Sequence, residues 1–91
     1  MPKRIQRKRT KGWKMPPNTV YVGRPTTWGN PFTVKEWGRE IAINNFRVML
    51  EENLLAIARV QAQLRGKDLA CWCPLDQPCH ADILLEIANK D

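Results

Sequence analysis

The stretch Asp68-Leu69-Ala70-Cys71-Trp72-Cys73-Pro74 reads as a short apolar strand that a proline ends. After it, Pro78 stands where the first turn of a helix tolerates proline. Apolar side chains then recur at helical spacing, which predicts the buried stripe of a last helix: Ile83, Leu84, Ile87 and Ala88. This segment therefore predicts a strand, a loop and a helix, and the rest of the fold is placed around that unit.

Two further strands and two further helices are predicted upstream. Thr19-Val20-Tyr21-Val22 is rich in β-branched and aromatic residues, and Ile5-Gln6-Arg7-Lys8-Arg9 is a candidate edge strand. The capping box Thr33-x-x-Glu36 begins a helix, with Trp37, Ile41, Phe46, Met49 and Leu50 falling close to one face. Gly38 weakens this helix, a break is expected near residues 50–53, and a second helix is expected over about residues 53–64.

The element order β-β-α-α-β-α indicates the α/β class. We predict a small three-stranded, at least partly parallel sheet packed with about three helices, because strands separated by helical stretches pair in parallel through a crossover. The 91 residues are divided into a basic N-terminal arm and loop over residues 1–18 and a single α/β domain over residues 19–91.

Charge is distributed unevenly along the chain, whose formal net charge is +6. Residues 1–35 hold nine Lys and Arg and no acidic residue, whereas residues 36–91 hold six bases and nine acids. Such asymmetry favours a polyanionic partner, either nucleic acid or a phosphorylated small molecule. The alternative is a basic tail that only keeps the protein in solution.

The cysteines and the apolar residues indicate the compartment. No run of about 18 apolar residues is present, so no membrane partner is expected. Three cysteines, an odd number, and the lack of an export signal argue against a disulfide framework. We therefore expect a cytoplasmic protein with reduced thiols.

All the soft metal ligands lie within ten residues: Cys71, Cys73, Cys79 and His80. Thiolates and imidazole bind zinc, so these four form a candidate Cys3His set. Two residues apart on a strand, Cys71 and Cys73 have Cα atoms about 6.5–7 Å apart. They share one metal ion only if the strand bends at its end, which Pro74 favours.

The same residues also suit catalysis. Cys79 lies at a predicted helix N-terminus, where the helix dipole favours a thiolate. His80 follows directly, and Asp76 or Asp82 is placed to orient it or to supply a carboxylate. Cys79, His80 and Asp82 are thus the candidate catalytic residues. The remaining interpretation is packing only, with Cys71 as a small buried side chain and His80 capping the helix.

A second group of candidates lies in the loop between Gly23 and Phe32. Arg24 suits a phosphate or carboxylate, Trp28 can stack on a base, and Asn30 can bind a polar edge. Trp13, between Lys11 and Lys14, adds the aromatic and basic mixture typical of nucleic-acid contacts. The alternative is a packed turn in which Trp28 covers the core and Asn30 binds backbone.

Three phrases of the sequence resemble a small family of phage and bacterial proteins known as domain of unknown function 4326. They are Gly12-Trp13-Lys14-Met15-Pro16, the run from Val22 to Phe32, and the run from Leu69 to Cys73 together with Pro78-Cys79-His80-Ala81-Asp82. The resemblance covers nearly the whole chain. Family members often have glycine where this chain has Ala81, so Ala81 is expected to narrow the approach of a ligand.

The resemblance implies a phage or mobile-element origin, and hence the cytoplasm of a host cell. It also implies that the family's motif positions gather around one site: Arg24, Trp28, Asn30, Cys71, Cys73, Cys79, His80 and Asp82. Our leading hypothesis is a small basic protein that binds nucleic acid or a nucleotide and holds zinc on its Cys/His centre. The alternatives are an enzyme that acts on a nucleotide or modified base, and a phage-encoded inhibitor that binds a host protein.

Overall fold

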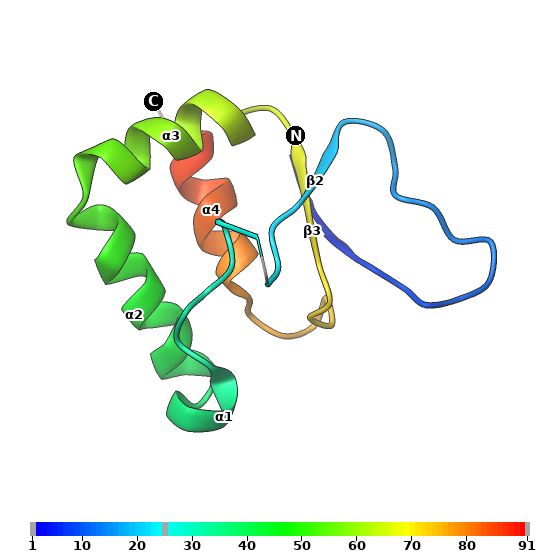
Figure 1. Cartoon of the computed structure of the whole chain (residues 1–91), viewed down its shortest axis with the longest axis horizontal. Coiled ribbons are helices and arrows are strands. Elements are labelled where there is room, and N and C mark those ends of the chain that lie inside the picture. The colour runs from blue at the N-terminus through cyan, green and yellow to red at the C-terminus, as the bar shows by residue number, and fades with distance from the viewer. Residues whose placement is uncertain (1, 25, 91) are drawn as a thin grey trace.

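The computed structural model describes residues 2–24 and 26–90 (Figure 1). Three residues lie outside this description: Met1 of the predicted arm, Pro25 of the candidate loop, and Asp91 at the end of the predicted domain. Three strands and four helices follow one another along the chain: β1 (Arg4–Gln6), β2 (Thr19–Tyr21), α1 (Val34–Trp37), α2 (Arg39–Glu51), α3 (Leu54–Leu64), β3 (Asp68–Cys71) and α4 (His80–Ala88).

The sheet has the order β1-β3-β2, and both pairings are parallel. Its central strand is the apolar segment Asp68–Cys71, whose residues Leu69, Ala70 and Cys71 are buried. The predicted α/β class with a three-stranded, at least partly parallel sheet is confirmed. Residues 4–6, from the segment expected to form a basic arm, provide one edge strand of that sheet.

Helix α4 lies between the sheet and the helix pair α2 and α3, and it contacts all of these elements. In Figure 1 the helices lie on one side of the sheet, and the segment between β1 and β2 extends on the other. The stripe predicted for the last helix is buried as expected, since Leu84 and Ala88 are 0% exposed and Ile83 and Ile87 are nearly so. Helix α4 packs against β3, and only residues 72–79 separate the two elements, so the start of α4 lies near the carboxyl end of β3.

The helix predicted to begin at Thr33 is interrupted after one turn. Thr33 accepts a hydrogen bond from the Glu36 backbone N–H (3.3 Å), as the capping box predicts, but Gly38 adopts φ 78° and ends α1. Glycine reaches this left-handed conformation without the steric cost that other residues meet. The second break, between α2 and α3, falls where it was predicted, and Asn53 caps α3 through its side chain.

The buried face of α2 differs from the face predicted from the sequence. Ala42, Phe46 and Leu50, spaced four residues apart, face the core. The face proposed from the sequence included Trp37, Ile41 and Met49, all of which are exposed. Trp37 belongs to α1, before Gly38. Ile41 lies about 140° around α2 from Phe46, so it was wrongly assigned to the buried face, and Met49 lies at the edge of that face. Among the described residues, no helix is long and apolar enough to cross a membrane.

A candidate metal centre at the end of the central strand

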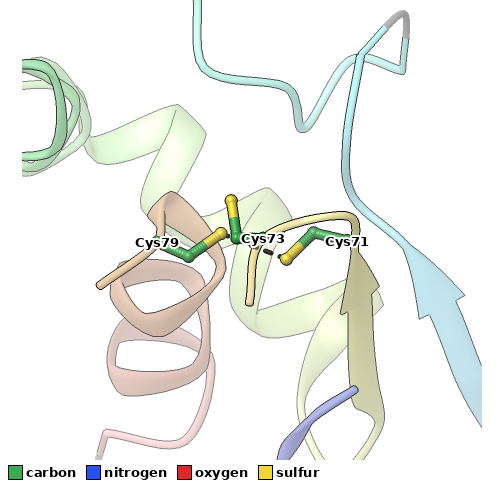
Figure 2. Close-up of side chains that lie close together, drawn as sticks. All are labelled: Cys71, Cys73 and Cys79. Atoms are coloured by element: carbon green, nitrogen blue, oxygen red, sulfur yellow. Dashed lines mark hydrogen bonds between the residues drawn. The ribbon is translucent and has the colours of Figure 1, made fainter. Parts of the chain in front are cut away.

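Three cysteines converge where β3 ends and α4 begins (Figure 2). Their sulfur atoms all lie within 4.8 Å of one another, and those of Cys71 and Cys79 are 3.1 Å apart. Strand β3 ends at Cys71 and the chain bends at Trp72 and Cys73. This bend is the condition under which Cys71 and Cys73 can share one metal ion. The three thiols thus form a group that could hold a metal ion.

Cys79 occupies the N-cap position of α4, and several donors favour its thiolate. Hydrogen bonds from the Cys71 and Cys73 thiols lower the pKa of Cys79 well below that of a free thiol, and the backbone N–H of Ala81 and the Arg4 guanidinium act in the same direction. The pKa of Cys71 is raised in turn, mainly by its hydrogen bonds to Cys73 and Cys79. Among the three thiols, Cys79 is therefore the one whose thiolate is most favoured, and Cys71 is the one that most favours the protonated thiol.

His80 lies beside this group but is not part of it. Its Nε2 is 2.8 Å from the carbonyl oxygen of Val22, and its Nδ1 is 3.5 Å from the sulfur of Cys79. A carbonyl accepts only from an N–H, so Nε2 carries the proton of the neutral ring and Nδ1 faces Cys79 as an acceptor. Burial lowers the pKa of His80, which keeps the ring neutral near pH 7.

The cysteines line a cavity of about 230 Å³ together with the loop after β2. Arg24 and Arg39 supply its positive charge, and three aromatic residues supply rings: Tyr21, Phe32 and Trp72. The Nη1 atom of Arg39 lies 3.7 Å from the sulfur of Cys73 and donates to the carbonyl of Pro78 (3.0 Å). The two groups of candidate residues that were separate in the sequence therefore face one cavity.

Three of the candidate ligand-binding residues do not offer polar atoms to this cavity. Asn30 is buried, donates from Nδ2 to the carbonyl of Ala42 (3.1 Å) and accepts from the Phe32 backbone N–H (2.9 Å). Trp28 packs against the core, with the Arg59 guanidinium 5.5 Å from its ring centroid. Trp13 lines a separate cavity of about 390 Å³ beside β1.

Comparison with known proteins places the chain in a family. Residues 5–90 match the family described as Domain of unknown function (DUF4326). The chain belongs to the DUF4326 family. It is also 34% identical over 74 residues to the "Uncharacterized 12.4 kDa protein in nrdA-td intergenic region" of Enterobacteria phage T4, a match that covers 78% of this chain and 68% of that protein. No solved structure matches the chain.

Two expectations drawn for this DUF4326 chain concern residues next to Cys79. Ala81 is fully buried in the core cluster and is not among the residues that line the cavity, so it does not narrow the approach of a ligand. Asp82 accepts a hydrogen bond from the Cys79 backbone N–H (3.0 Å), which fixes the first turn of α4. Its other oxygen, Oδ1, lies 3.5 Å from Nε of Arg4.

Arg4, beside the three cysteines, is one of the residues that the sequence did not reveal as part of the candidate site. Its side chain is only 8% exposed, and Nη2 donates to the carbonyls of Pro74, Leu75 and Gln77 at 2.7–3.2 Å. Nη1 is buried without a hydrogen-bond partner among the described residues. The sequence does not show which arginine or lysine in a run of basic residues is buried. Only the pairing of β1 with β3 brings it under the cysteine loop.

Proposed function

We propose that this protein binds a nucleotide in the 230 Å³ cavity, above a zinc ion held by Cys71, Cys73 and Cys79. One observation carries the proposal: the three thiols share the cavity with two guanidinium groups and three aromatic rings. Thiolates suit a soft or borderline metal ion, guanidinium groups suit phosphate, and aromatic rings suit a base.

Zinc is the metal that this donor set favours. Sulfur atoms within 4.8 Å of one another are close enough to coordinate a single ion, and zinc commonly takes thiolate ligands in tetrahedral sites. Three protein ligands would leave one coordination position for another ligand, and all three cysteines line the cavity. The charges of Arg4 and Arg39 offset the negative charge of three thiolates on one divalent ion.

The cavity walls supply the features that a nucleotide requires. Neither Arg24 nor Arg39 forms an ion pair with a carboxylate within the part of the chain that the structure describes. Arg24 is therefore available to bind a phosphate in the bidentate manner typical of arginine, and Arg39 can donate from the nitrogen atoms other than Nη1, which binds the Pro78 carbonyl. Tyr21, Phe32 and Trp72 line the cavity and supply aromatic surface against which a base can pack.

A second candidate function is catalysis on such a nucleotide, favoured by the contact between Cys79 and His80. With Nε2 bound to the Val22 carbonyl, Nδ1 of His80 is directed to accept the proton of the Cys79 thiol. The thiolate of Cys79 would then be the nucleophile. Because Cys79 is 1% exposed, a substrate would have to reach it through the cavity.

Metal analysis and thiol titration separate these two functions. The zinc proposal predicts about one equivalent of zinc in the purified protein, and three thiols that react with a titrant only after a chelator is added. The variant C73S should contain less than one equivalent of zinc, whereas T27S, a change at an exposed position, should retain the zinc content of the unmodified protein. A metal-free protein in which only Cys79 is alkylated at neutral pH would contradict the zinc proposal and favour catalysis.

Nucleotide binding is tested by calorimetry with nucleoside 5′-monophosphates. We expect binding that is weakened by R24Q and by R39Q and unaffected by K90Q, which removes the same charge beyond the far end of α4. Nucleosides without phosphate should bind more weakly than the monophosphates, because the two guanidinium groups lose their partner. If no nucleotide binds at low salt, the proposed function is wrong.

A further inference from the structure

We infer that the nucleotide enters the cavity as part of a single strand of nucleic acid, whose neighbouring phosphates bind Arg7 and Arg9. This inference rests on the proposed function and names the class of molecule that carries the nucleotide. It is built on a stack of arginine and aromatic side chains at the rim of the cavity, formed by Arg7, Arg9, Tyr21 and Trp72.

Arg7 is held between two rings. Its guanidinium carbon lies 4.5 Å from the ring centroid of Tyr21 and 4.6 Å from that of Trp72, and both rings also line the cavity. The Arg7 backbone N–H donates to the carbonyl of Cys71 (2.8 Å), which continues the pairing of β1 with β3. The charge of Arg7 is therefore fixed at the rim by the sheet and by two aromatic faces.

The ring of Tyr21 is itself held in place. Its hydroxyl donates to the carbonyl of Arg24 (2.8 Å), so the phenol lies over the backbone of Gly23. A Cβ atom at residue 23 would collide with this phenol, and glycine avoids the collision because it has no Cβ atom. The rim is thus a preformed surface, in which Arg24 of the cavity and Arg7 of the stack are joined through Tyr21.

The two arginines of the stack form no ion pair with a carboxylate of the described residues. Arg9 lies 4.8 Å from the Trp72 ring centroid and is exposed, and neither Arg7 nor Arg9 is paired with a carboxylate in residues 2–24 and 26–90. The Nε atom of Arg7 is buried and has no hydrogen-bond partner among those residues. Within the described residues, the two guanidinium groups at the rim are therefore free of ionic partners.

A phosphodiester strand fits this surface better than an acidic peptide does. Regularly spaced phosphates match a row of arginines that no acidic residue interrupts, since residues 1–35 contain none. The adjoining cavity and aromatic rings accept a base, as in proteins that bind single strands. A peptide carboxylate would satisfy the arginines but would leave the cavity without a matching group.

The size of the cavity favours an unpaired strand. Its 230 Å³ is below the range of about 300–1,000 Å³ that is typical of small-molecule pockets. It therefore suits one base whose own phosphate binds Arg24 and Arg39, and the neighbouring nucleotides of the strand lie at the rim beside the stack. In a duplex the bases are stacked and paired, so reaching the cavity would require a base to be flipped out at a cost of a few kcal/mol.

The test measures binding of a fluorescently labelled twelve-nucleotide oligothymidylate by anisotropy over a series of salt concentrations, with oligouridylate as a second arm. The variant R7Q/R9Q is compared with K67Q/K90Q, which removes two charges at the opposite end of β3 and beyond α4. R9Q alone serves as the second variant, because Arg9 is exposed and its replacement leaves the sheet intact.

We expect the oligonucleotide to bind more tightly than the mononucleotide. R7Q/R9Q should weaken this binding about tenfold and reduce the slope of log K against log salt by about 1.4, since each phosphate contact to a single strand contributes about 0.7. R9Q should give half of that change in slope. K67Q/K90Q should retain the slope of the unmodified protein.

The outcomes separate this inference from the proposed function. If mononucleotides bind but the oligonucleotide binds no more tightly, the single-strand inference is overturned and the proposed function stands. If neither binds, the proposed function is wrong and the inference is lost with it. Equal affinity for a duplex of the same length, or an equal loss of slope in K67Q/K90Q, would also overturn the inference.

Discussion

Nε of Arg4 lies 3.5 Å from Oδ1 of Asp82, so a side chain of the first strand is paired with the first turn of the last helix. The same guanidinium binds three carbonyls of the loop that joins β3 to α4. Arg4 thus holds the chain between Cys73 and Cys79 in the shape that brings their sulfur atoms together.

Replacing Arg4 should therefore destabilise the protein. The variant R4M keeps much of the apolar stem but removes the charge and leaves three carbonyls without their donor. A hydrogen bond to a charged group contributes about 1.5–3 kcal/mol, so we expect the free energy of unfolding to fall by about 2–3 kcal/mol. Urea denaturation followed by circular dichroism measures this change.

Lys11, exposed in the turn before Trp13, provides the matched control. K11M makes the same chemical change at a solvent-exposed position and should alter the free energy of unfolding by no more than about 0.5 kcal/mol. R4K should recover part of the loss only, because an ammonium group cannot reproduce the spread of the guanidinium donors. Equal stability of R4M and K11M would show that Arg4 does not hold the loop.

The metal-free, reduced protein should become more stable as the pH rises from about 6.5 to 8.5. Hydrogen bonds from Cys71 and Cys73 lower the pKa of Cys79 in the folded state, whereas a free thiol has a pKa of about 8.5. In this window the unfolded chain binds one more proton than the folded chain. The free energy of unfolding should rise by up to about 1.4 kcal/mol per pH unit.

Above about pH 8.5 the trend should reverse. The pKa of Cys71 is raised by its hydrogen bonds to Cys73 and Cys79, so the unfolded chain then loses a proton that the folded chain retains. Urea midpoints across this range, with thiolate absorbance recorded in parallel, test both limbs. C79S keeps a good N-cap residue but should lose the rising limb. A rising limb that survives in C79S would exclude Cys79 as its source.

His80 should add a separate loss of stability below about pH 6.5. Burial lowers its pKa in the folded state, so between that value and 6.5 the unfolded chain binds a proton that the folded chain does not. Stability is therefore lost as the pH falls through this window. H80Q retains an amide donor for the Val22 carbonyl and should remove this added slope, leaving the slope that Cys79 contributes. Titration of the His80 ring by NMR measures the pKa directly, and an unchanged value would contradict the prediction.

The strand that begins at Asp68, the buried stripe of α4 and the cap at Thr33 were predicted from the sequence because each depends on local chemistry; the strand ends at Cys71, two residues before the predicted end. Apolar spacing and capping side chains act within a few residues. The break at Gly38 was missed as a boundary, because glycine within a helical pattern is often tolerated.

The same distinction between local and long-range features applies to the candidate site. The cysteines and Arg24 were identified because thiols and arginine carry recognisable chemistry at short spacing. Arg4 and Arg7 were not, because their burial and their unpartnered nitrogen atoms arise from pairing between strands more than 60 residues apart in the chain. For Asn30 the sequence left two interpretations open. The structure shows it bound to backbone on both sides of its amide.

Asn30 therefore provides the last prediction. Its amide joins the Phe32 backbone N–H to the carbonyl of Ala42, so it fixes the loop that carries Arg24 against α2. N30A leaves a buried donor and a buried acceptor without a partner and should lower the free energy of unfolding by about 1–3 kcal/mol. N44A, at an exposed position on the same helix, is the control and should cost less than about 1 kcal/mol.

N30D makes the role of the amide specific. An aspartate at this position still accepts from the Phe32 N–H, but its second oxygen faces the carbonyl oxygen of Ala42, and two acceptors repel each other. N30D should therefore be less stable than N30A at neutral pH and should recover as the pH is lowered and the carboxyl gains the proton that it can donate. Urea denaturation of N30A, N30D and N44A at two pH values measures this. If N30D were as stable as the unmodified protein at neutral pH, the hydrogen bond to Ala42 would contribute nothing to holding the loop.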